Sequence, residues 1–579
     1  MMKKYILLFA AVIAALCICS CTDGNADETT PPIVETDTEG VTAPKENEDT
    51  VIPDIPTDHV NIRDFNRGDG WNKALQRAFE VSDNVYFPKG KYRLETVYLN
   101  DGQTIFGDGD ETVIEQMSDN LFWIDGKVTA SSDLAVDMKD FSNEIETLAK
   151  LNAKPGDVIY LLSQRNTNIL EDCGYEWCQG RSYYSGHTSF FSEFLTVKEA
   201  MGNKIITEEN TIFPFYYKDD TRESDPKKPT SNVEDWPYRR KATTVYLIDV
   251  AENVTIRDLS IENAHGRVIV THWSDNLLIS GVNVSTKKGT EPEKKIKFVD
   301  IFYSRSASVK NCNFRFETLP ADIDTYTTFN EYGYFTPLYI YAGYKCGFEN
   351  CSINFSTRGF NIGKCDKKGI SYGCYVKNCT SENARFAGIT VNSGSYDTVI
   401  SGNKITGCAH GIMQGGRKSI ISDNEIRGGL AGDISYYYVK PNEGGTSGIM
   451  LFEGYAVDAI VKNNRISEVS TGVLIRDGYE DTNIFEIGPI SVIDNYITDV
   501  SMGIMTYRNS HNTKTTKFEL TVSGNNIIGG KRNGEYMGST AFFFTGEVSD
   551  ILIENNRTEG FLKFSNIRTD HNKGISVNP

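Results

Sequence analysis

The chain has 579 residues, of which 24% are charged, and its formal net charge at pH 7 is −19. Residues 22–58 contribute −10 and two N-terminal lysines contribute +2, so residues 59–579 carry −11. A mildly acidic body argues against a nucleic-acid-binding protein. The local basic stretches at 239–241 and 287–297 are expected to be solvated loops.

The N-terminus is typical of a secretory signal. Lys3 and Lys4 precede an apolar run that ends at Leu16, which is shorter than an ordinary transmembrane span. The following Ile18-Cys-Ser-Cys21 resembles the lipobox of bacterial lipoproteins. This resemblance implies cleavage after residue 20 and attachment to a membrane only through lipid on Cys21.

Residues 22–58 are rich in Thr, Pro and acids and poor in aromatics, which predicts a disordered, self-repelling tether. Its first acids resemble the surface-export signal of Bacteroidetes-type lipoproteins. The resemblance implies an outer-membrane lipoprotein that faces either the cell surface or the periplasm.

Residues 59–144 are expected to hold an N-terminal cap and the first strands. Asp69 can cap a short helix in which Trp71, Leu75, Ala78 and Phe79 share one face. Such a helix would shield the open end of a stacked-repeat fold, whose apolar interior would otherwise meet water.

Residues 145–245 are expected to form an inserted β side domain, with strands near 154–162, 193–197 and 203–207. Cys173 and Cys178 in this segment are close enough in sequence to form a disulfide in an oxidising compartment. No His/Cys spacing in the chain resembles a zinc site.

Residues 246–579 repeat. Similar short sequence motifs recur around six asparagines spaced 21 to 40 residues apart, Asn403, Asn424, Asn464, Asn495, Asn525 and Asn556. Their flanking runs alternate with period 2 and lack long helical patterns, which predicts parallel strands stacked about 4.8 Å apart. One asparagine per coil would form an internal ladder that satisfies backbone groups at a corner.

Shorter versions of this motif occur earlier in the chain, at Asn311, Asn350 and Asn378. Each of these asparagines is followed by a cysteine, and we expect Cys312, Cys351 and Cys379 to stack inside the coils as small hydrophobic residues.

Three motifs carry a family resemblance. They are Asp64-Phe-x-x-Gly-Asp-Gly, Val85-Tyr-Phe-Pro-x-Gly-x-Tyr and Thr104-Ile-x-Gly-x-Gly. They resemble the N-terminal region of the pectate-lyase superfamily, which includes rhamnogalacturonase-like, epimerase-like and phage-tailspike proteins. The resemblance implies an all-β, right-handed parallel β-helix, and it leaves the reaction open.

Chemistry is expected where alternating side chains point outward from the strand that follows the ladder corner. Aromatic side chains beside amides and cations suit sugar rings, which present apolar faces and hydroxyl edges. Thr271 is expected among the outward residues. The expected substrate-binding residues are His272, Phe302, Arg305, Tyr339, Tyr341, Asn361, Lys364, Asn392 and Arg476.

Five acids are candidates for catalysis, Asp300, Asp322, Asp324, Glu453 and Asp477. Asp300 is the clearest outward acid within a strand, and Asp322 and Asp324 lie on the loop that leaves its coil. Glycosidases place two carboxyl groups about 5–5.5 Å or about 6.5–9.5 Å apart. Positions one or two coils apart, at about 4.8 Å per coil, match those separations.

Further along the same face, outward apolar residues form a stripe, Met413, Met450, Phe452, Leu474 and Met505. A bare stripe of this length is unusual on a monomer. Either the insertion 429–446 folds over it or a neighbouring subunit of a homotrimer does. We favour the insertion.

The expected function is an extracytoplasmic carbohydrate-active enzyme that cleaves a polysaccharide, with a glycoside hydrolase favoured over a polysaccharide lyase. The sequence lacks the calcium-acid motif of pectate lyases and the Asn-Thr-Asp and Arg-Ile-Lys motifs of polygalacturonases. No cofactor is expected for a hydrolase, whereas a lyase would allow Ca²⁺. The alternative is a non-catalytic glycan-binding or adhesive surface protein of tailspike type.

Overall fold

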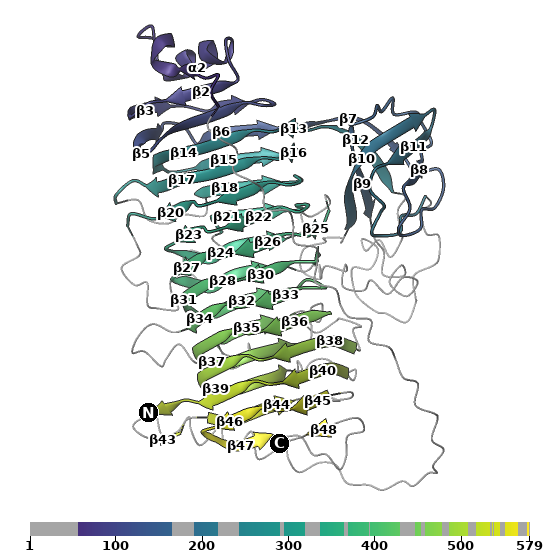
Figure 1. Ribbon diagram of the computed structural model, residues 1–579, viewed down its shortest axis with the longest axis vertical. Coiled ribbons are helices and arrows are strands. Elements are labelled where there is room, and N and C mark those ends of the chain that lie inside the picture. Colours follow the sequence, from purple (N-terminus) through teal and green to yellow (C-terminus); the bar gives the residue numbers. More distant parts are fainter. Residues whose placement is uncertain are drawn as a thin grey trace, which may run out of the picture. The chain divides into compact units, whose positions relative to one another are not determined.

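The computed structural model describes a set of ranges (Figure 1), namely residues 56–164, 190–217, 243–289, 295–318, 336–363, 369–392, 394–428, 446–452, 458–476, 486–507, 517–532, 535–536, 538–544, 551–565 and 576–577. Nearly all regular structure in these ranges is β-strand. Within them, no helix has the length and apolar character needed to cross a membrane.

Most strands belong to one 36-stranded sheet that winds into stacked coils, as predicted from the repeats (Figure 1). Each strand pairs in parallel with its counterparts in the coils before and after it, so the chain forms a parallel β-helix. Three walls run along this stack, and each wall takes one strand or part of a strand from every coil.

The wall that later carries the candidate site is called the site wall. Its strands, in stacking order, are β4 (Val97–Leu99), β6 (Asn120–Asp125), β15 (Arg267–His272), β18 (Lys297–Phe302), β21 (Leu338–Tyr341), β24 (Ser356–Gly363), β28 (Ala384–Val391), β32 (His410–Gln414), β35 (Ser447–Leu451), β37 (Arg465–Arg476), β39 (Tyr496–Tyr507), β44 (Gly538–Phe544) and β47 (Phe561–Ser565).

The second wall contains β1 (Val60–Asn61), β2 (Asn84–Phe87), β5 (Thr104–Gln116), β14 (Thr255–Ala264), β17 (Leu278–Thr286), β19 (Ser308–Lys310), β22 (Gly347–Glu349), β26 (Tyr375–Lys377), β30 (Val399–Ser401), β33 (Ile420–Ser422), β36 (Ala459–Lys462), β38 (Glu486–Ile493), β40 (Lys517–Ser523), β45 (Ile551–Glu554) and β48 (Ser576–Val577).

The third wall uses the later parts of β5, β14 and β17 and the first parts of β37 and β39. Its other strands are β3 (Gly90–Leu94), β20 (Asn313–Arg315), β23 (Ser352–Ile353), β27 (Thr380–Glu382), β31 (Lys404–Cys408), β34 (Glu425–Gly428), β41 (Asn526–Gly529) and β46 (Arg557–Glu559). Short pairs at bends are β13 (Ala251–Glu252) with β16 (Ser274–Asp275), β25 (Ser371–Tyr372) with β29 (Ser395–Tyr396), and β42 (Lys531–Arg532) with β43 (Glu535–Tyr536).

The interior is filled by columns of apolar side chains, one from each coil. One column on the second wall has no exposed member and consists of Ile256, Ile279, Val309, Phe348, Val376, Ile400, Ile421, Val461, Val492, Val522 and Ile553. Burying such side chains stabilises each coil by about 1.5–3 kcal/mol per residue. The alternation in sequence is therefore the main determinant of the fold.

The asparagine ladder also lies where the sequence placed it. Asn464 is buried, its amide nitrogen donates to the carbonyl of Ile421 at 3.0 Å and to Oδ1 of Asn495 at 2.9 Å, and its own Oδ1 accepts from the backbone of Asn424 at 3.0 Å. The same contacts recur from Asn403 to Asn556.

Before Asn403 the ladder position is occupied by cysteine. The backbone N–H of Cys379 donates to Oδ1 of Asn403 at 2.8 Å, and that of Cys351 donates to Sγ of Cys379 at 3.5 Å. Asn311, Asn350 and Asn378 instead occupy the position before the ladder residue, and their backbone φ angles are 52° to 54°. In these earlier coils the asparagine thus lies one residue before the ladder position, which the cysteine occupies. The cysteines therefore continue the ladder as well as filling space in the interior.

The cap consists of a short 3₁₀ helix, η1 (Ile62–Phe65), and one α-helix, α2 (Trp71–Phe79), whose Ala74, Leu75 and Ala78 are buried. The prediction that Asp69 caps this helix is wrong, because Gly70 is the N-cap and makes no side-chain capping bond. Asp69 accepts two hydrogen bonds from Arg77 instead, at 2.7 and 2.9 Å. These bonds lower the pKa of Asp69 to about 2.

A separate six-stranded sheet is inserted between β6 and β13. Its order is β7 (Lys127–Asp133), β12 (Thr244–Asp249), β9 (Val158–Gln164), β10 (Phe190–Met201), β11 (Lys204–Thr207) and β8 (Glu144–Glu146). These strands run from 127 to 249, whereas the sequence placed the boundaries at 145 and 245. Cys173 and Cys178 lie outside the described residues, as do Cys21 and residues 22–55 of the tether.

The inserted sheet packs against the coils through an apolar cluster. Its residues Tyr160 and Phe194 lie against Trp273, Tyr303 and Tyr344 of the coil bends. Because those bends directly follow β15, β18 and β21, the inserted sheet borders one end of the site wall.

Candidate functional site

Two outward columns of the site wall form the candidate site. The first places Trp123, Val270, Asp300, Tyr339 and Asn361 side by side on successive coils. The second column, two residues later on each strand, is Asp125, His272, Phe302, Tyr341 and Gly363. Thr271 was expected to face outward, but it pairs with Ile301 in the inward set and is fully buried.

Four rings form a stack across successive coils, which we call the aromatic ladder, Trp123, His272, Phe302 and Tyr341. The ring centroids of Phe302 and Tyr341 lie 4.5 Å apart with an interplanar angle of 6°, and those of His272 and Phe302 lie 4.8 Å apart at 20°. Trp123 lies 5.5 Å from His272. All four side chains are partly exposed. The structure thus brings together three residues that the sequence proposed for substrate binding.

Asp300 lies beside the ladder and is almost inaccessible, with 2% of its side chain exposed. Burial raises the pKa of its carboxyl to about 6, although the charges of Lys297 and Arg267 act in the opposite direction. Within the described residues, its Oδ1 has no hydrogen-bond partner. Buried polar atoms in folded proteins are usually paired, so an unpaired carboxyl oxygen marks a functional candidate.

Two cations border Asp300, and the sequence prediction missed both. Nε of Arg267 lies 3.9 Å from Oδ2 of Asp300, on the preceding coil. Lys297, at the start of β18, donates to the carbonyl of Thr336 at 2.6 Å, and burial lowers its pKa. Lys297 was assigned to a solvated basic loop, but it belongs to a strand, three residues before the outward acid.

His272 is held by a carboxylate. Its Nδ1 lies 2.6 Å from Oδ1 of Asp125, and the indole of Trp123 donates to the other oxygen of Asp125. The exposed fractions of the two paired side chains are 25% for His272 and 46% for Asp125. The sequence did not single out Trp123 or Asp125, since they lie before the inserted sheet and more than 140 residues from His272.

The ladder ends at the coil of Gly363. Asn392 donates to Oδ1 of Asn361 at 2.9 Å and to the hydroxyl of Tyr339 at 3.4 Å. A Cβ atom on Gly363 would lie 2.7 Å from that hydroxyl, so the polar groups fill the place where a further ladder ring would stand. Tyr339, Asn361 and Asn392 therefore adjoin the ladder, with Asn361 fully buried.

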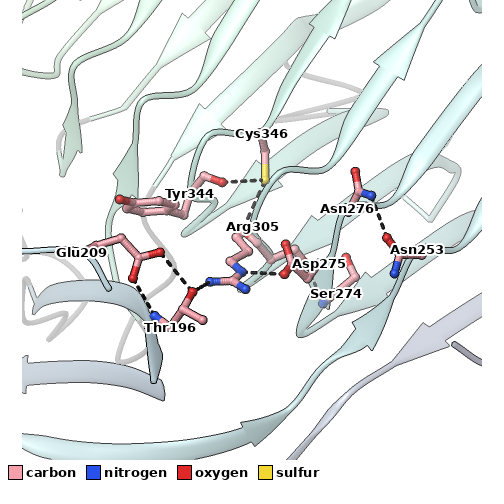
Figure 2. A network of polar contacts seen from close by, with 10 residues as sticks. Thr196, Glu209, Asn253, Ser274, Asp275, Asn276, Arg305, Tyr344 and Cys346 are labelled. Carbon is pink, nitrogen blue, oxygen red and sulfur yellow. Dashed lines mark hydrogen bonds and ion pairs between the residues drawn. The ribbon is translucent and has the colours of Figure 1, made fainter. Parts of the chain in front are cut away.

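Arg305 takes part in a different contact (Figure 2). Its Nε donates to Asp275 at 2.6 Å and its Nη1 donates to the hydroxyl of Thr196 at 2.9 Å, while Thr196 is in turn bound to Glu209. Thr196 lies on β10 of the inserted sheet. Arg305, proposed for substrate binding, thus joins that sheet to the coils.

Arg476 is also separated from Asp300. It lies at the end of β37, six strands along the site wall from β18, which corresponds to about 29 Å. The remaining proposed site residues, Asp322, Asp324, Lys364, Glu453 and Asp477, lie outside the described residues.

The apolar stripe forms a cluster of its own, separate from the main core. Met413, Met450, Phe452, Leu474 and Met505 are all at most 8% exposed and pack with Phe386, Met502, Tyr507 and Phe543. Residues 429–445 of the proposed covering insertion lie outside the described residues. Across the described ranges, no three His, Cys, Asp or Glu side chains come together in a way that could hold a metal ion.

Comparison with known proteins agrees with this architecture. The model of a family described as "Right handed beta helix region" matches residues 337–520. The fold is a right-handed parallel β-helix. Among curated proteins, none matches the sequence significantly.

Two solved structures illustrate the similarity. The gp54 tailspike of Acinetobacter baumannii bacteriophage AP22, solved with a capsular saccharide, is 10% identical, with a TM-score of 0.54 over 90% of this chain and 79% of that one. The Pseudomonas phage phi297 tailspike gp61 is 13% identical, with a TM-score of 0.50 over 85% and 73%. At such identities the likeness establishes the β-helix fold and leaves the activity open.

Proposed function

We propose that this β-helix protein is an extracytoplasmic enzyme that cleaves a polysaccharide, with Asp300 as the proton donor. The observation that carries the proposal is a buried carboxyl with an unpaired oxygen next to a partly exposed aromatic ladder. The ladder offers flat apolar surfaces at one-coil intervals, and sugar rings have apolar faces that stack on such surfaces. A saccharide bound to a tailspike of the same fold supports this class of ligand.

Asp300 has the properties that a general acid requires. A carboxyl must keep its proton near neutral pH to donate it to a glycosidic oxygen, and burial raises its pKa for this purpose. Asp300 has a pKa of about 6 because its carboxyl is desolvated. This favours a glycoside hydrolase, whose leaving oxygen is protonated by such an acid.

A polysaccharide lyase is the second candidate, and Arg267 and Lys297 favour it. A lyase neutralises the carboxylate of a uronic acid before a proton is removed from the neighbouring carbon. The guanidinium and ammonium groups beside Asp300 would suit such a carboxylate.

The test is a screen of the purified protein on a polysaccharide panel, with measurement of both new reducing ends and the absorbance of unsaturated uronates. On a cleaved polysaccharide, Asp300→Asn should lower kcat by at least about 10²-fold, the usual effect of losing a general acid. Phe302→Ala should mainly weaken binding. Wild-type kcat in a folded Asp300→Asn variant would refute the proposal, and binding without cleavage by any preparation would favour the glycan-binding alternative.

A further inference from the structure

The hydrolytic form of the proposed function needs a second group, one that removes a proton from the attacking water. This inference therefore rests on the assignment of Asp300. Among the described outward residues of β15, β18 and β21, the side chains able to exchange protons near Asp300 are His272, Lys297, Arg267 and two tyrosines. Arginine ordinarily stays charged and tyrosine ordinarily stays protonated at neutral pH. Burial lowers the pKa of Lys297, but its Nζ donates to the carbonyl of Thr336 at 2.6 Å. Histidine is therefore the suitable base.

His272 is oriented for this role by Asp125. A carboxylate oxygen accepts, so the 2.6 Å contact fixes the proton on Nδ1 and leaves a lone pair on Nε2. Stacking on Phe302 on one side and contact with Trp123 on the other hold the ring in place. In the described part of the chain, no hydrogen bond engages Nε2.

The position of His272 relative to Asp300 also fits. His272 lies one coil before Asp300 and two residues further along its strand. With about 4.8 Å between coils and about 6.6 Å for two residues, their Cα atoms are about 8 Å apart. The acid and base groups of inverting glycosidases are about 6.5–9.5 Å apart, which leaves room for the substrate and a water molecule. Side chains that leave the same face of the wall from backbone positions about 8 Å apart can reach such a separation.

We propose that His272 is the general base that activates water for glycoside hydrolysis opposite Asp300, and that Asp125 is its positioning residue. Nε2 of His272 takes a proton as the water oxygen bonds to the anomeric carbon. The bond from that carbon to the glycosidic oxygen breaks, and the leaving oxygen takes the proton of Asp300. Because the water attacks the face opposite the leaving oxygen, the anomeric configuration is inverted. Solvent then carries one proton from the imidazolium to the Asp300 carboxylate, which restores both groups.

Among the residues that the structure describes, few charged groups lie around His272. Asp125 contacts it directly, and the charge of Asp300 interacts with it through space. Lys127 and Asp249, next along the chain, pair with each other at 3.1 Å. Asp125 is therefore the charged residue whose substitution tests how the imidazole is oriented.

The first test separates catalysis from stacking. His272→Phe retains an aromatic ring between Trp123 and Phe302, so it should bind oligosaccharide with a Kd within about threefold of wild type and lose at least about 10²-fold in kcat. Phe302→Ala is the matched control, in which binding weakens more than kcat falls. Wild-type kcat in His272→Phe would overturn the inference, while an inactive Asp300→Asn variant in the same assay would leave the proposed function standing.

The second test uses pH and product. In Asp125→Asn the imidazolium loses its negative partner, so the acid limb of kcat/KM should move to lower pH while the kcat at the optimum falls. A merely structural Asp125 would lower activity without moving that limb, which would overturn its positioning role.

The first product observed by NMR should have the inverted anomeric configuration. Retention, or an unsaturated uronate product, would overturn the role of His272 as a base acting on water.

Discussion

Asp300 illustrates how a candidate site residue weakens the fold that contains it. A carboxyl that is removed from water without a full set of hydrogen bonds is unfavourable in its charged form. Its pKa of about 6 is above the ordinary value of 3.8, so the folded state holds a proton that the unfolded chain has released. The wild-type protein should therefore lose stability as pH rises from about 4 to about 6, and the loss persists above that range.

Asp300→Asn should remove this penalty. The shift of about two pKa units corresponds to at most about 3 kcal/mol of stability above pH 6. The Tm of the variant should exceed that of wild type at pH 7.5, and the difference should become much smaller at pH 4, which is close to the ordinary pKa of 3.8 and below the folded pKa of about 6. Equal Tm differences at the two pH values would show that Asp300 is not the group concerned.

Alternation alone could place Asp300 and most of the ladder, because successive residues of a strand face opposite sides. It failed at Thr271, where the outward residue is Val270. It could not find Asp125, which reaches His272 only because the inserted sheet leaves and rejoins the coils between them. Contacts set by an insertion have no local signature in sequence.

At the scale of the coil, the corner ladder is the repeated element. Cysteine replaces asparagine in the earlier coils and keeps part of the same bonding, since the thiol of Cys351 donates to the carbonyls of Val309 at 3.3 Å and Glu349 at 3.2 Å. Spacing between asparagines predicted the ladder but not this substitution. Between the earlier and the later coils the residue at the ladder position changes from cysteine to asparagine, while its place in the corner stays the same.

Asn464→Ala should leave the backbone N–H of Asn424 without its partner, which costs about 1–3 kcal/mol. It should also remove one hydrogen bond from each of the carbonyls of Ile421 and Lys462. Asn464→Cys should lose less, because a thiol makes similar contacts in Cys351. Thermal unfolding of both variants provides the measurement. If Cys were as destabilising as Ala, the thiols of the earlier coils would not be acting as ladder residues.

At the scale of the whole molecule, the inserted sheet is joined to the coils by Arg305. Asp275 is mostly buried, and burial raises its pKa, whereas the hydrogen bond and charge of Arg305 lower it. Removing the guanidinium would leave a buried carboxyl and the hydroxyl of Thr196 without a shared partner. The contact thus couples the sheet to the bend after the candidate site.

Arg305→Ala should loosen this contact by about 2 kcal/mol, the usual loss for hydrogen bonds to a charged group. Hydrogen exchange in β10 near Thr196 should then speed up by about 30-fold. Arg315→Ala is the control, because Arg315 pairs with Glu317 at the surface, where such pairs contribute at most about 1 kcal/mol. Unchanged exchange in Arg305→Ala would contradict the docking role, and a complete loss of glycan binding would return Arg305 to the substrate-binding set.

The N-terminal residues predict that the protein is held at a membrane by lipid. Ile18-Cys-Ser-Cys21 and the acidic residues 22–58 predict a lipid on Cys21 and a tether with a mean span of about 35 Å. Cys21→Ala should remove the lipid site and release the protein from the membrane fraction, since no other anchor is expected from the sequence. Cys17→Ala is the matched control, because it changes a cysteine of the leader and leaves the lipobox intact. Fractionation of cells that express each variant, followed by immunoblotting, makes the comparison, and membrane retention of Cys21→Ala would exclude lipidation at this residue as the anchor.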